Sequence, residues 1–275
     1  VDPCDGATAA TATNCLADGV PADFMQDGNT VLTGVGGNPD VEPEEADTFT
    51  FGVVLAPGFA EGFTATIDYF DIKIDNAINA VDGSDQLRLC YLDPAVYAEF
   101  CNSFTRDPIT RQVTFLSKRP VNAAKEEVSG IDVAFTYNTE IAGLDTLFTL
   151  RATRLLTHEN QANPAAEVEV LKGKITADRG SFAEWRANAS AKVFADHWNA
   201  SWSMRMIGEA DDENGGGPIG SSVDNVFYHD VHFTYQVTES AKLSLGVDNL
   251  FDEEPPFITS WNDANTDVFT YDLMG

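Results

Sequence analysis

Strict alternation of apolar and polar residues is the dominant pattern along the chain. From Phe182 to Ala195, apolar residues occupy every second position, and polar or charged residues lie between them. A period of two is typical of a β-strand with one apolar face. The pattern repeats from Trp198 to Met206 after a tight turn, so the two segments are predicted to form a hairpin.

Six further segments show the same alternation. They span residues 48–55, 63–69, 131–137, 148–153, 227–237 and 242–248. A ninth strand is expected to begin near Thr270. One short helix is expected at 94–100, and residues 1–43 are expected to form a long loop.

The connections between the predicted strands are alternately short and long. The short ones are 57–62, 139–144, 196–197 and 238–240, and the long ones are 76–127, 156–181, 208–224 and 252–267. In an up-and-down antiparallel sheet, successive connections lie at opposite ends, so all the long loops gather at one end. This asymmetry is typical of outer-membrane barrels, whose strands cross the bilayer in about 9–11 residues.

We therefore expect an all-β fold, an antiparallel up-and-down transmembrane β-barrel. A soluble β-sandwich also alternates, but its strands are usually about 5–6 residues long and its Greek-key crossings disturb the loop order. In a barrel the apolar faces contact lipid and the polar faces line the lumen. The residues expected to face the lumen are Glu184, Arg186, Lys192, Arg205, Asp230 and His232.

The charge balance limits the possible partners. There are 44 Asp and Glu residues against 16 Lys and Arg, a net charge of −28. This argues against nucleic acid or an anionic membrane surface as a partner, because both require basic side chains. A hydrophobic content of 43% is too high for a disordered acidic segment. No run of 18 apolar residues appears, so no membrane-spanning helix is expected.

Four cysteines form two pairs, each separated by 11 positions, in polar stretches of two long loops. The pairs are Cys4 with Cys15 and Cys90 with Cys101. The C-x-x-C spacing of zinc sites is absent, so two local disulfides in an oxidising compartment are favoured over four reduced thiols. Such disulfides would hold the loops in a shape competent for binding.

The segment Gly246-Val-Asp-Asn-Leu-Phe-Asp-Glu-Glu-Pro-Pro-Phe257 resembles the closing segment of TonB-dependent outer-membrane receptors. The residues that carry this motif are Gly246, Asn249, Leu250, Phe251, Pro255 and Pro256. Residues 43–52, 62–74 and 130–137 look like strands from the middle of the family's barrel. The resemblance thus extends from about residue 40 to the end of the chain.

The resemblance implies a barrel of about 22 strands with a plugged lumen. Residues 1–275 would be the C-terminal part of the barrel domain, roughly its last nine strands, with an extracellular loop at 1–43, strands and loops at 44–275, and an incomplete last strand. Such receptors lie in the outer membrane of Gram-negative bacteria. They import a scarce, large nutrient, of the ferric siderophore or oligosaccharide class, driven by the TonB protein through a plug region that lies outside this sequence.

Other functional classes remain open at this stage. A passive porin or an adhesin-type barrel would share the strand pattern, and a secreted soluble β-sandwich binding protein is a third alternative. The chain contains no Ser/His/Asp set, G-x-S-x-G run or phosphate-binding loop, so an enzyme is not expected. The expected partners are outer-membrane lipid, an extracellular nutrient ligand and TonB.

Candidate ligand contacts lie in the long loops. Loop aromatics can stack on sugar rings, and the candidates are Tyr91, Tyr97, Phe100, Phe104 and Trp261. The acidic run Asp211, Asp212 and Glu213 offers oxygen ligands to calcium but lacks the spacing of a defined calcium loop. No cofactor is expected apart from this weak calcium candidate.

Overall fold

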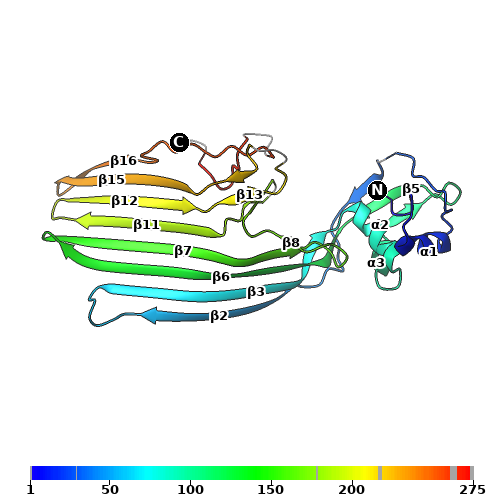
Figure 1. The fold of residues 1–275 in the computed structure, drawn as a ribbon, viewed down its shortest axis with the longest axis horizontal. Coiled ribbons are helices and arrows are strands. Elements are labelled where there is room, and N and C mark those ends of the chain that lie inside the picture. The colour runs from blue at the N-terminus through cyan, green and yellow to red at the C-terminus, as the bar shows by residue number, and fades with distance from the viewer. Residues whose placement is uncertain (1, 29, 178, 216–218, 261–264, 273–275) are drawn as a thin grey trace. The chain divides into compact units, whose positions relative to one another are not determined.

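The computed structural model describes residues 2–28, 30–177, 179–215, 219–260 and 265–272. The chain divides into two compact units (Figure 1). The unit that we call the sheet unit comprises Asp47–Lys73, Glu127–Asn160 and Glu169–Gly275. The other, the loop unit, comprises Val1–Ala46, Ile74–Glu126 and Gln161–Val168.

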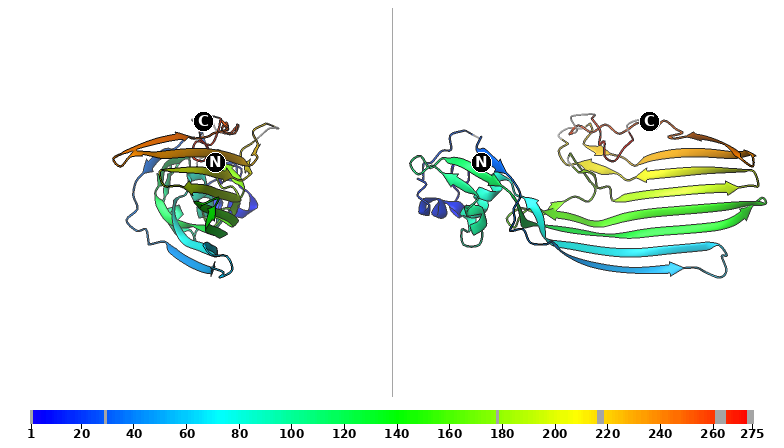
Figure 2. Two further views of the ribbon diagram at one scale, coloured as in Figure 1. Left: turned by 90° about the vertical axis from the view of Figure 1, so that its left-hand side faces the viewer. Right: turned by 180° about the vertical axis from the view of Figure 1, so that it is seen from behind.

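A nine-stranded antiparallel sheet dominates the fold, as the alternation predicts (Figure 2). Its order is β16-β15-β12-β11-β7-β6-β3-β2, and the short β8 pairs with the end of β7. The strands are β2 (Glu45–Leu55), β3 (Phe63–Ala80), β6 (Pro120–Ile141), β7 (Leu144–Gln161), β8 (Glu169–Val170), β11 (Trp185–Phe194), β12 (Trp198–Ile207), β15 (Val226–Thr238) and β16 (Ala241–Val247). This order confirms the predicted all-β, up-and-down architecture, although the described strands do not close into a ring.

The register sorts the side chains into apolar and polar rows across the sheet. One row runs through Phe148, Ala191, Trp202, Val231 and Val247. The next row runs through Leu147, Lys192, Ser201, His232 and Gly246. Because successive side chains point to opposite faces, a slip of one residue would exchange the two sets, so the alternation specifies this register.

The connections follow the predicted order of short and long. The short turns all lie at one end of the sheet, on the left in Figure 1. The turn that joins β6 to β7 has only two residues, Ala142 and Gly143, with φ values of 54° and 80°. Positive φ at both central residues gives the type I′ turn that matches the twist of the flanking strands.

The predicted strand near Thr270 does not form within the described residues. Thr270 lies in a turn in which the backbone N–H groups of Thr270 and Tyr271 donate to the carbonyl of Asp267, at 3.3 and 3.1 Å. Tyr271 is buried in a hydrophobic cluster with Ile175 and Ile258. Packing of this loop therefore replaces the extended conformation that the local sequence indicates. The same region contains a four-stranded sheet of β10 (Gly180–Ser181), β9 (Lys174–Thr176), β13 (Ala210–Asp212) and β14 (Ser222–Val223).

The strands β3 and β6 continue well beyond their predicted ends, into the segment expected to be a loop. Two ion pairs join the extensions, Lys73 with Glu127 at 3.0 Å and Lys125 with Asp75 at 2.9 Å. Charged residues fill these ends, so the apolar alternation fades there while the backbone pairing persists.

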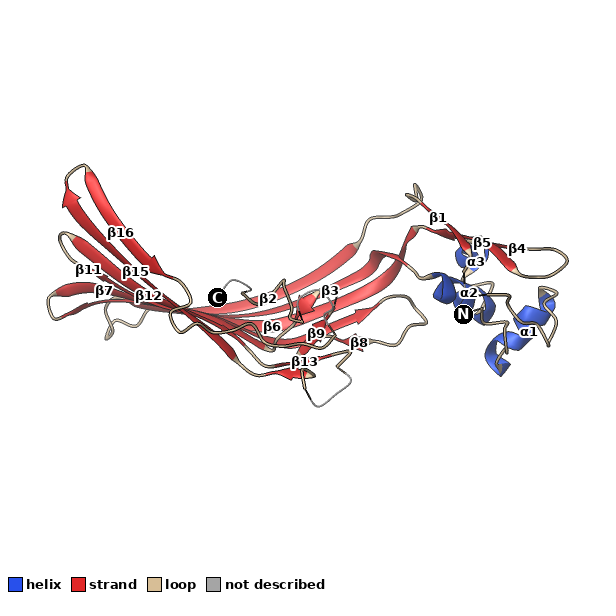
Figure 3. Cartoon of the chain, turned by 90° about the horizontal axis from the view of Figure 1, so that it is seen from above, coloured by secondary structure: helices blue, strands red, loops and turns tan. Residues whose placement is uncertain are grey.

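The loop unit contains all the described helices (Figure 3). They are α1 (Ala9–Ala17), α2 (Gly83–Leu92) and α3 (Ala98–Cys101), and none of them is both long and apolar enough to cross a membrane. A three-stranded sheet of β1 (Leu32–Val35), β5 (Val113–Lys118) and β4 (Phe104–Arg106) accompanies them, with β1 parallel to β5. Residues 1–43, expected as a loop, thus contribute a helix and a strand, and the helix expected at 94–100 lies at 98–101.

Candidate functional site

The loop unit is organised around a buried guanidinium group. The side chain of Arg106 is 4% exposed, and that of its partner Asp2 is 2% exposed. Nη1 and Nη2 of Arg106 donate to the two carboxylate oxygens of Asp2 at 2.7 and 2.8 Å, and Nε donates to the Tyr91 hydroxyl at 2.8 Å. The Tyr91 hydroxyl donates in turn to Asp18 at 2.6 Å. A buried charge pair is tolerated when hydrogen bonds satisfy it in this way.

The protonation states within this network follow from the same contacts. Burial raises the pKa of Tyr91, and the hydrogen bond that Tyr91 donates to Asp18 raises it further. Burial acts to lower the pKa of Arg106, but the hydrogen bonds to Asp2 and Tyr91 outweigh it, and the pKa is raised. The phenol therefore stays protonated and the guanidinium stays charged at neutral pH.

The two predicted disulfides are both present in the loop unit. Cys4 joins Cys15 with the Cα atoms 5.8 Å apart, and Cys90 joins Cys101 with the Cα atoms 4.8 Å apart. The first pair packs in a hydrophobic cluster with Phe24, and Cys90 belongs to a second cluster. The second disulfide fixes α2 to α3, so the stapled segments form a folded unit with its own core.

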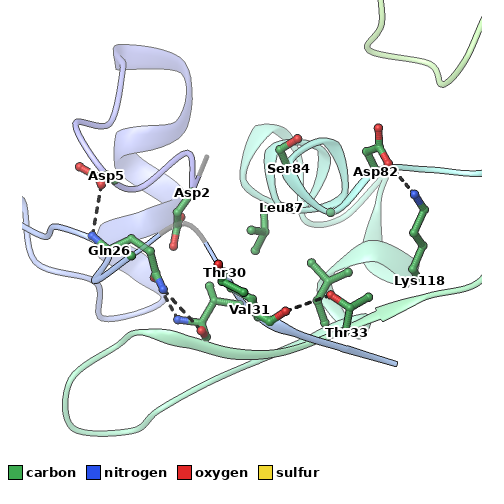
Figure 4. Close-up of a pocket in the computed structure, with 14 residues that line it drawn as sticks. Asp2, Asp5, Gln26, Thr30, Val31, Thr33, Asp82, Ser84, Leu87 and Lys118 are labelled. Atoms are coloured by element: carbon green, nitrogen blue, oxygen red, sulfur yellow. Dashed lines mark hydrogen bonds and ion pairs between the residues drawn. The ribbon is translucent and has the colours of Figure 1, made fainter. Parts of the chain in front are cut away.

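A cavity of about 620 Å³ lies between the N-terminal segment, β1, α2 and β5 (Figure 4). Lys118 on its wall forms an ion pair with Asp82 at 2.6 Å. Asp5 accepts a hydrogen bond from the backbone N–H of Gln26 at 3.2 Å. The wall also includes Thr30, Val31, Thr33, Ser84, Leu87, Val113 and Leu116. Its size suits a small ligand or one arm of a larger ligand.

A second cavity of about 680 Å³ lies elsewhere in the loop unit, bordered by α3, β5 and the segment around residue 40. Its wall holds the carboxylates of Asp40, Glu42 and Glu99 together with Arg119. Gln86 also lines this cavity and is 2% exposed. The amide nitrogen of Gln86 donates to the carbonyl of Val81 at 2.8 Å, and its Oε1 has no hydrogen-bond partner in the described structure.

The predicted loop aromatics occupy different environments. Tyr91 and Phe100 are 2% and 3% exposed and belong to the two hydrophobic clusters, so their rings are not open stacking surfaces. Tyr97 and Phe104 are half-buried and pack against those clusters. Trp261 lies outside the described residues.

The acidic run on β13 is engaged in contacts within the protein. Asp211 forms an ion pair with Lys174 at 3.4 Å, and Asp212 accepts a hydrogen bond from the backbone N–H of Ser260 at 3.2 Å. The backbone N–H of Glu213 donates to a strand carbonyl of β9. Across the described parts of the chain, no three His, Cys, Asp or Glu side chains are grouped as metal ligands.

Five of the six residues predicted to face the lumen lie on one face of the sheet. The register places Arg186, Lys192, Arg205, Asp230 and His232 in alternate positions of β11, β12 and β15. Arg205 forms an ion pair with Asp272, and His232 lies 3.5 Å from Asp248. These five residues thus lie on the polar face of the sheet, opposite the apolar rows, and carry charges of both signs.

Glu184 differs from the other five because it lies just before β11. Its carboxylate binds Arg154 at 2.9 Å and Lys172 at 3.8 Å. The guanidinium of Arg154 lies 5.3 Å from the ring centroid of Trp185, which is on the apolar face. The backbone carbonyl of Glu184 still accepts from Leu155 of β7, at 2.9 Å, and its face toward the lumen stays a prediction.

The motif residue Asn249 shapes the segment that follows β16. It has a φ of 48°, and its backbone N–H donates to Asp230 at 2.9 Å. Its side-chain amide donates to the carbonyl of Glu253 at 3.0 Å and accepts from the N–H of the same residue at 2.9 Å. Asparagine tolerates this left-handed conformation better than most residues. The motif thus forms a closed turn.

The other motif residues anchor this turn to the sheet. The N–H of Leu250 donates to the carbonyl of His229 at 2.6 Å, and the ring of Phe251 lies edge-on to His229 with centroids 5.0 Å apart. A Cβ at Gly246 would lie 2.6 Å from the ring of His232, so a larger residue would require this ring to move. Pro255 and Pro256 follow in a half-buried segment without regular structure.

Sequence reasoning does not identify the residues that organise the loop unit. Asp2, Arg106 and Gln86 belong to no motif, and their contacts join segments far apart in the sequence or depend on burial alone. The one available signal is that residues 1–46 contain nine Asp and Glu residues and no Lys or Arg. A basic partner for any carboxylate of this segment must therefore come from elsewhere in the chain, as Arg106 does for Asp2.

Comparison with known proteins places this architecture in a family. Residues 8–250 match the family model described as TonB dependent receptor-like, beta-barrel. No curated protein matches the chain in sequence. Two solved structures with a similar fold are a mutant ferric enterobactin receptor from Pseudomonas aeruginosa in complex with enterobactin (TM-score 0.58) and the ferric enterobactin receptor PfeA in complex with BCV-L6 (TM-score 0.59).

Both solved structures are 15% identical to this chain, and the similarity covers 86% of this chain and 30% of each receptor. At that identity the likeness shows the fold, and the chain spans less than a third of the receptors' length. The family match covers most of the chain and coincides with the observed antiparallel sheet. The chain therefore belongs to the TonB-dependent receptor family and supplies part of its β-barrel.

Proposed function

We propose that this chain is part of an outer-membrane receptor of a Gram-negative bacterium that captures a scarce, large nutrient and imports it with energy from TonB. The observation that carries the proposal is the loop unit, a folded body with two disulfides and two cavities, within a chain of this family. Preformed loops reduce the ordering cost when a ligand is captured.

The sheet fits the same role. Large apolar side chains such as Phe49, Phe51 and Leu245 are exposed on it, and lipid is the environment that would cover them. The polar face with Arg205, Asp230 and His232 would line the lumen. TonB would act on a plug region, which is not among the 275 residues of this sequence.

The imported ligand is proposed to belong to the ferric siderophore or oligosaccharide class. The solved structures with a similar fold include ferric enterobactin receptors, which supports a siderophore without identifying it. The stacking of loop aromatics on sugar rings would support the second class, but Tyr91 and Phe100 are buried.

The test is energised uptake in the native host. Accumulation of iron-55 siderophores and of labelled oligosaccharides is measured in wild-type cells, in cells lacking this receptor and in cells lacking TonB. We expect one compound to require both proteins. Uptake that persists without TonB would indicate a passive porin, and recovery of the protein in the soluble fraction would indicate a secreted binding protein.

A further inference from the structure

The strand β1 forms an open edge of the small sheet in the loop unit (Figure 3). It pairs with β5 on one side, and no other strand of the described residues pairs with it. The backbone hydrogen bonds of the described loops do not reach β1 either. Because an edge strand bonds to its neighbour on one side only, the N–H and C=O groups on its other side can pair with another chain.

The composition of this segment suits pairing with a further strand. Residues 28–39 contain no Asp, Glu, Lys or Arg. Leu32 and Val35, at the two ends of β1, are 73% and 82% exposed. An edge strand without a partner is usually protected by a charge, a proline or a bulge, and β1 has none of these. Its backbone edge and apolar side chains are therefore open to contact with an added strand.

The register of β1 with β5 divides the neighbouring side chains between two faces. Leu32 is paired with Phe115, and Thr33 is paired with Leu116. The cavity of about 620 Å³ is lined by Thr33 and Leu116 and not by Leu32 or Phe115, so it lies on the face of the second pair (Figure 4). In a strand added to β1, alternate side chains would thus flank Leu32, and the others would point toward this cavity.

The surroundings of β1 favour a basic partner. Asp5 lines the cavity, accepts one backbone hydrogen bond from Gln26 at 3.2 Å and has no ion pair with a described residue. Lys118, the one basic residue among the described lining residues, is already paired with Asp82 at 2.6 Å. The charged residues that flank the uncharged segment are all acidic: Asp23, Asp27, Asp40, Glu42 and Glu44. Carboxylates attract a basic strand and repel an acidic one.

We infer that β1 accepts an extended peptide segment of a partner protein as an additional strand. Apolar side chains of that segment pack beside Leu32, and a lysine or arginine side chain enters the cavity and pairs with Asp5. In this mode of recognition the backbone hydrogen bonds give affinity, and the alternate side chains give specificity. The interaction goes beyond the proposed import of a nutrient, and it requires neither the plug nor TonB.

The experiment measures binding of a fluorescein-labelled peptide that alternates valine and lysine to the full 275-residue chain in detergent micelles, by fluorescence anisotropy. Successive N–H groups of a strand point to opposite edges, so N-methylation of the valines or of the lysines blocks one edge only. We expect one methylated peptide to bind roughly tenfold more weakly than the other, a loss of about two hydrogen bonds. Equal binding of the two methylated peptides, or tighter binding of a peptide with glutamate in place of lysine, would overturn the inference.

Two variants of the chain test the side-chain contacts. Leu32→Lys places a charge beside the valines of the peptide, and Asp5→Asn removes the carboxylate but keeps an acceptor for Gln26. Each should weaken peptide binding roughly two- to fivefold, the range of one cross-strand pair or exposed ion pair. The matched controls are Met25→Lys, at a residue that is also 73% exposed, and Asp23→Asn, because neither residue lies in β1 or lines the cavity. Equal losses in the variants and their controls would contradict these contacts.

Sedimentation of the chain without peptide distinguishes a partner protein from a second copy of this chain. We expect a single protomer. Dimers that Leu32→Lys dissociates would show that β1 pairs with another copy, which overturns the assignment to a partner protein. Uptake assays are separate: peptide binding without TonB-dependent uptake contradicts only the proposed function, and uptake without peptide binding contradicts only this inference.

Discussion

Arg106 and Asp2, 104 positions apart in the sequence, meet in a bidentate ion pair inside the loop unit. The two nitrogens of the guanidinium each donate to one oxygen of the carboxylate, at 2.7 and 2.8 Å. Three aromatic rings lie near the same guanidinium, with centroids 5.2 to 5.7 Å away. The pair ties the start of the chain to β4 and is shielded from solvent.

Replacing Arg106 by methionine should destabilise the loop unit by about 3–5 kcal/mol, because it leaves the carboxylate of Asp2 buried without a partner. Hydrogen exchange at the amides of α1 and β4 measures the loss. The double variant Arg106→Met with Asp2→Asn removes both charges and should recover part of the stability. A single variant no less stable than the double variant would contradict the role of the pair.

Removing the disulfide between Cys90 and Cys101 should destabilise the loop unit by about 3 kcal/mol on the chain-entropy estimate for an 11-residue separation. Replacement of both cysteines by alanine, followed by hydrogen exchange at the amides of α2 and α3, measures the loss. The matched control replaces Cys4 and Cys15, which have the same separation but pack in the other hydrophobic cluster. Unchanged exchange in α2 and α3 after loss of Cys90 and Cys101 would contradict this role of the disulfide.

The stability of the loop unit should fall in alkaline solution because of Tyr91. Burial and the hydrogen bond to Asp18 raise its pKa in the folded state, whereas an unfolded tyrosine titrates at about pH 10. The unfolded state thus releases its proton first, so the stabilisation is complete below about pH 10 and decreases as the pH rises toward the folded pKa. Unfolding curves at several alkaline pH values measure this loss. In Tyr91→Phe the decrease above pH 10 should be smaller, and an unchanged slope would exclude Tyr91 as its source.

Asn249→Ala should reduce the folding of the C-terminal segment of the sheet unit. Alanine removes both side-chain hydrogen bonds to Glu253 and is strained at a φ of 48°, at a combined cost of about 1–3 kcal/mol. The fraction of chain that shows heat-modifiable migration after refolding is the measurement. Asn249→Asp keeps the acceptor, so its folded fraction should lie between those of the alanine variant and the unchanged chain. Identical folding of the alanine variant and the unchanged chain would mean that the turn contributes little.

The sequence predicts the sheet well because its signal is local. Ala191, Trp202 and Val231 alternate with polar neighbours on three strands, and the same pattern fixes the strands, their order and their faces. The prediction fails where a non-local contact decides the conformation: Thr270 lies in a turn because Tyr271 packs into a cluster.

The loop unit was largely hidden in the sequence because non-local contacts form it. The cysteine spacing predicts two disulfides of it correctly, and the helix expected at 94–100 overlaps α3. The parallel pairing of Leu32 with Phe115 and the ion pair of Arg106 with Asp2 have no periodic signature. The cavity wall depends on the same long-range packing, so Gln86 could not be recognised as a candidate.

The location of the loop unit tests the central claim most directly. Intact cells that produce a variant with Cys4 and Cys15 replaced by alanine are treated with a membrane-impermeant reductant and then with a membrane-impermeant maleimide, which labels Cys90 and Cys101. A cysteine introduced in a short turn by Asp196→Cys serves as the control from the opposite end of the sheet. The account predicts labelling of Cys90 and Cys101 in intact cells and labelling of the turn only after lysis. Labelling of Cys90 and Cys101 only after lysis would contradict an extracellular loop unit that captures nutrients.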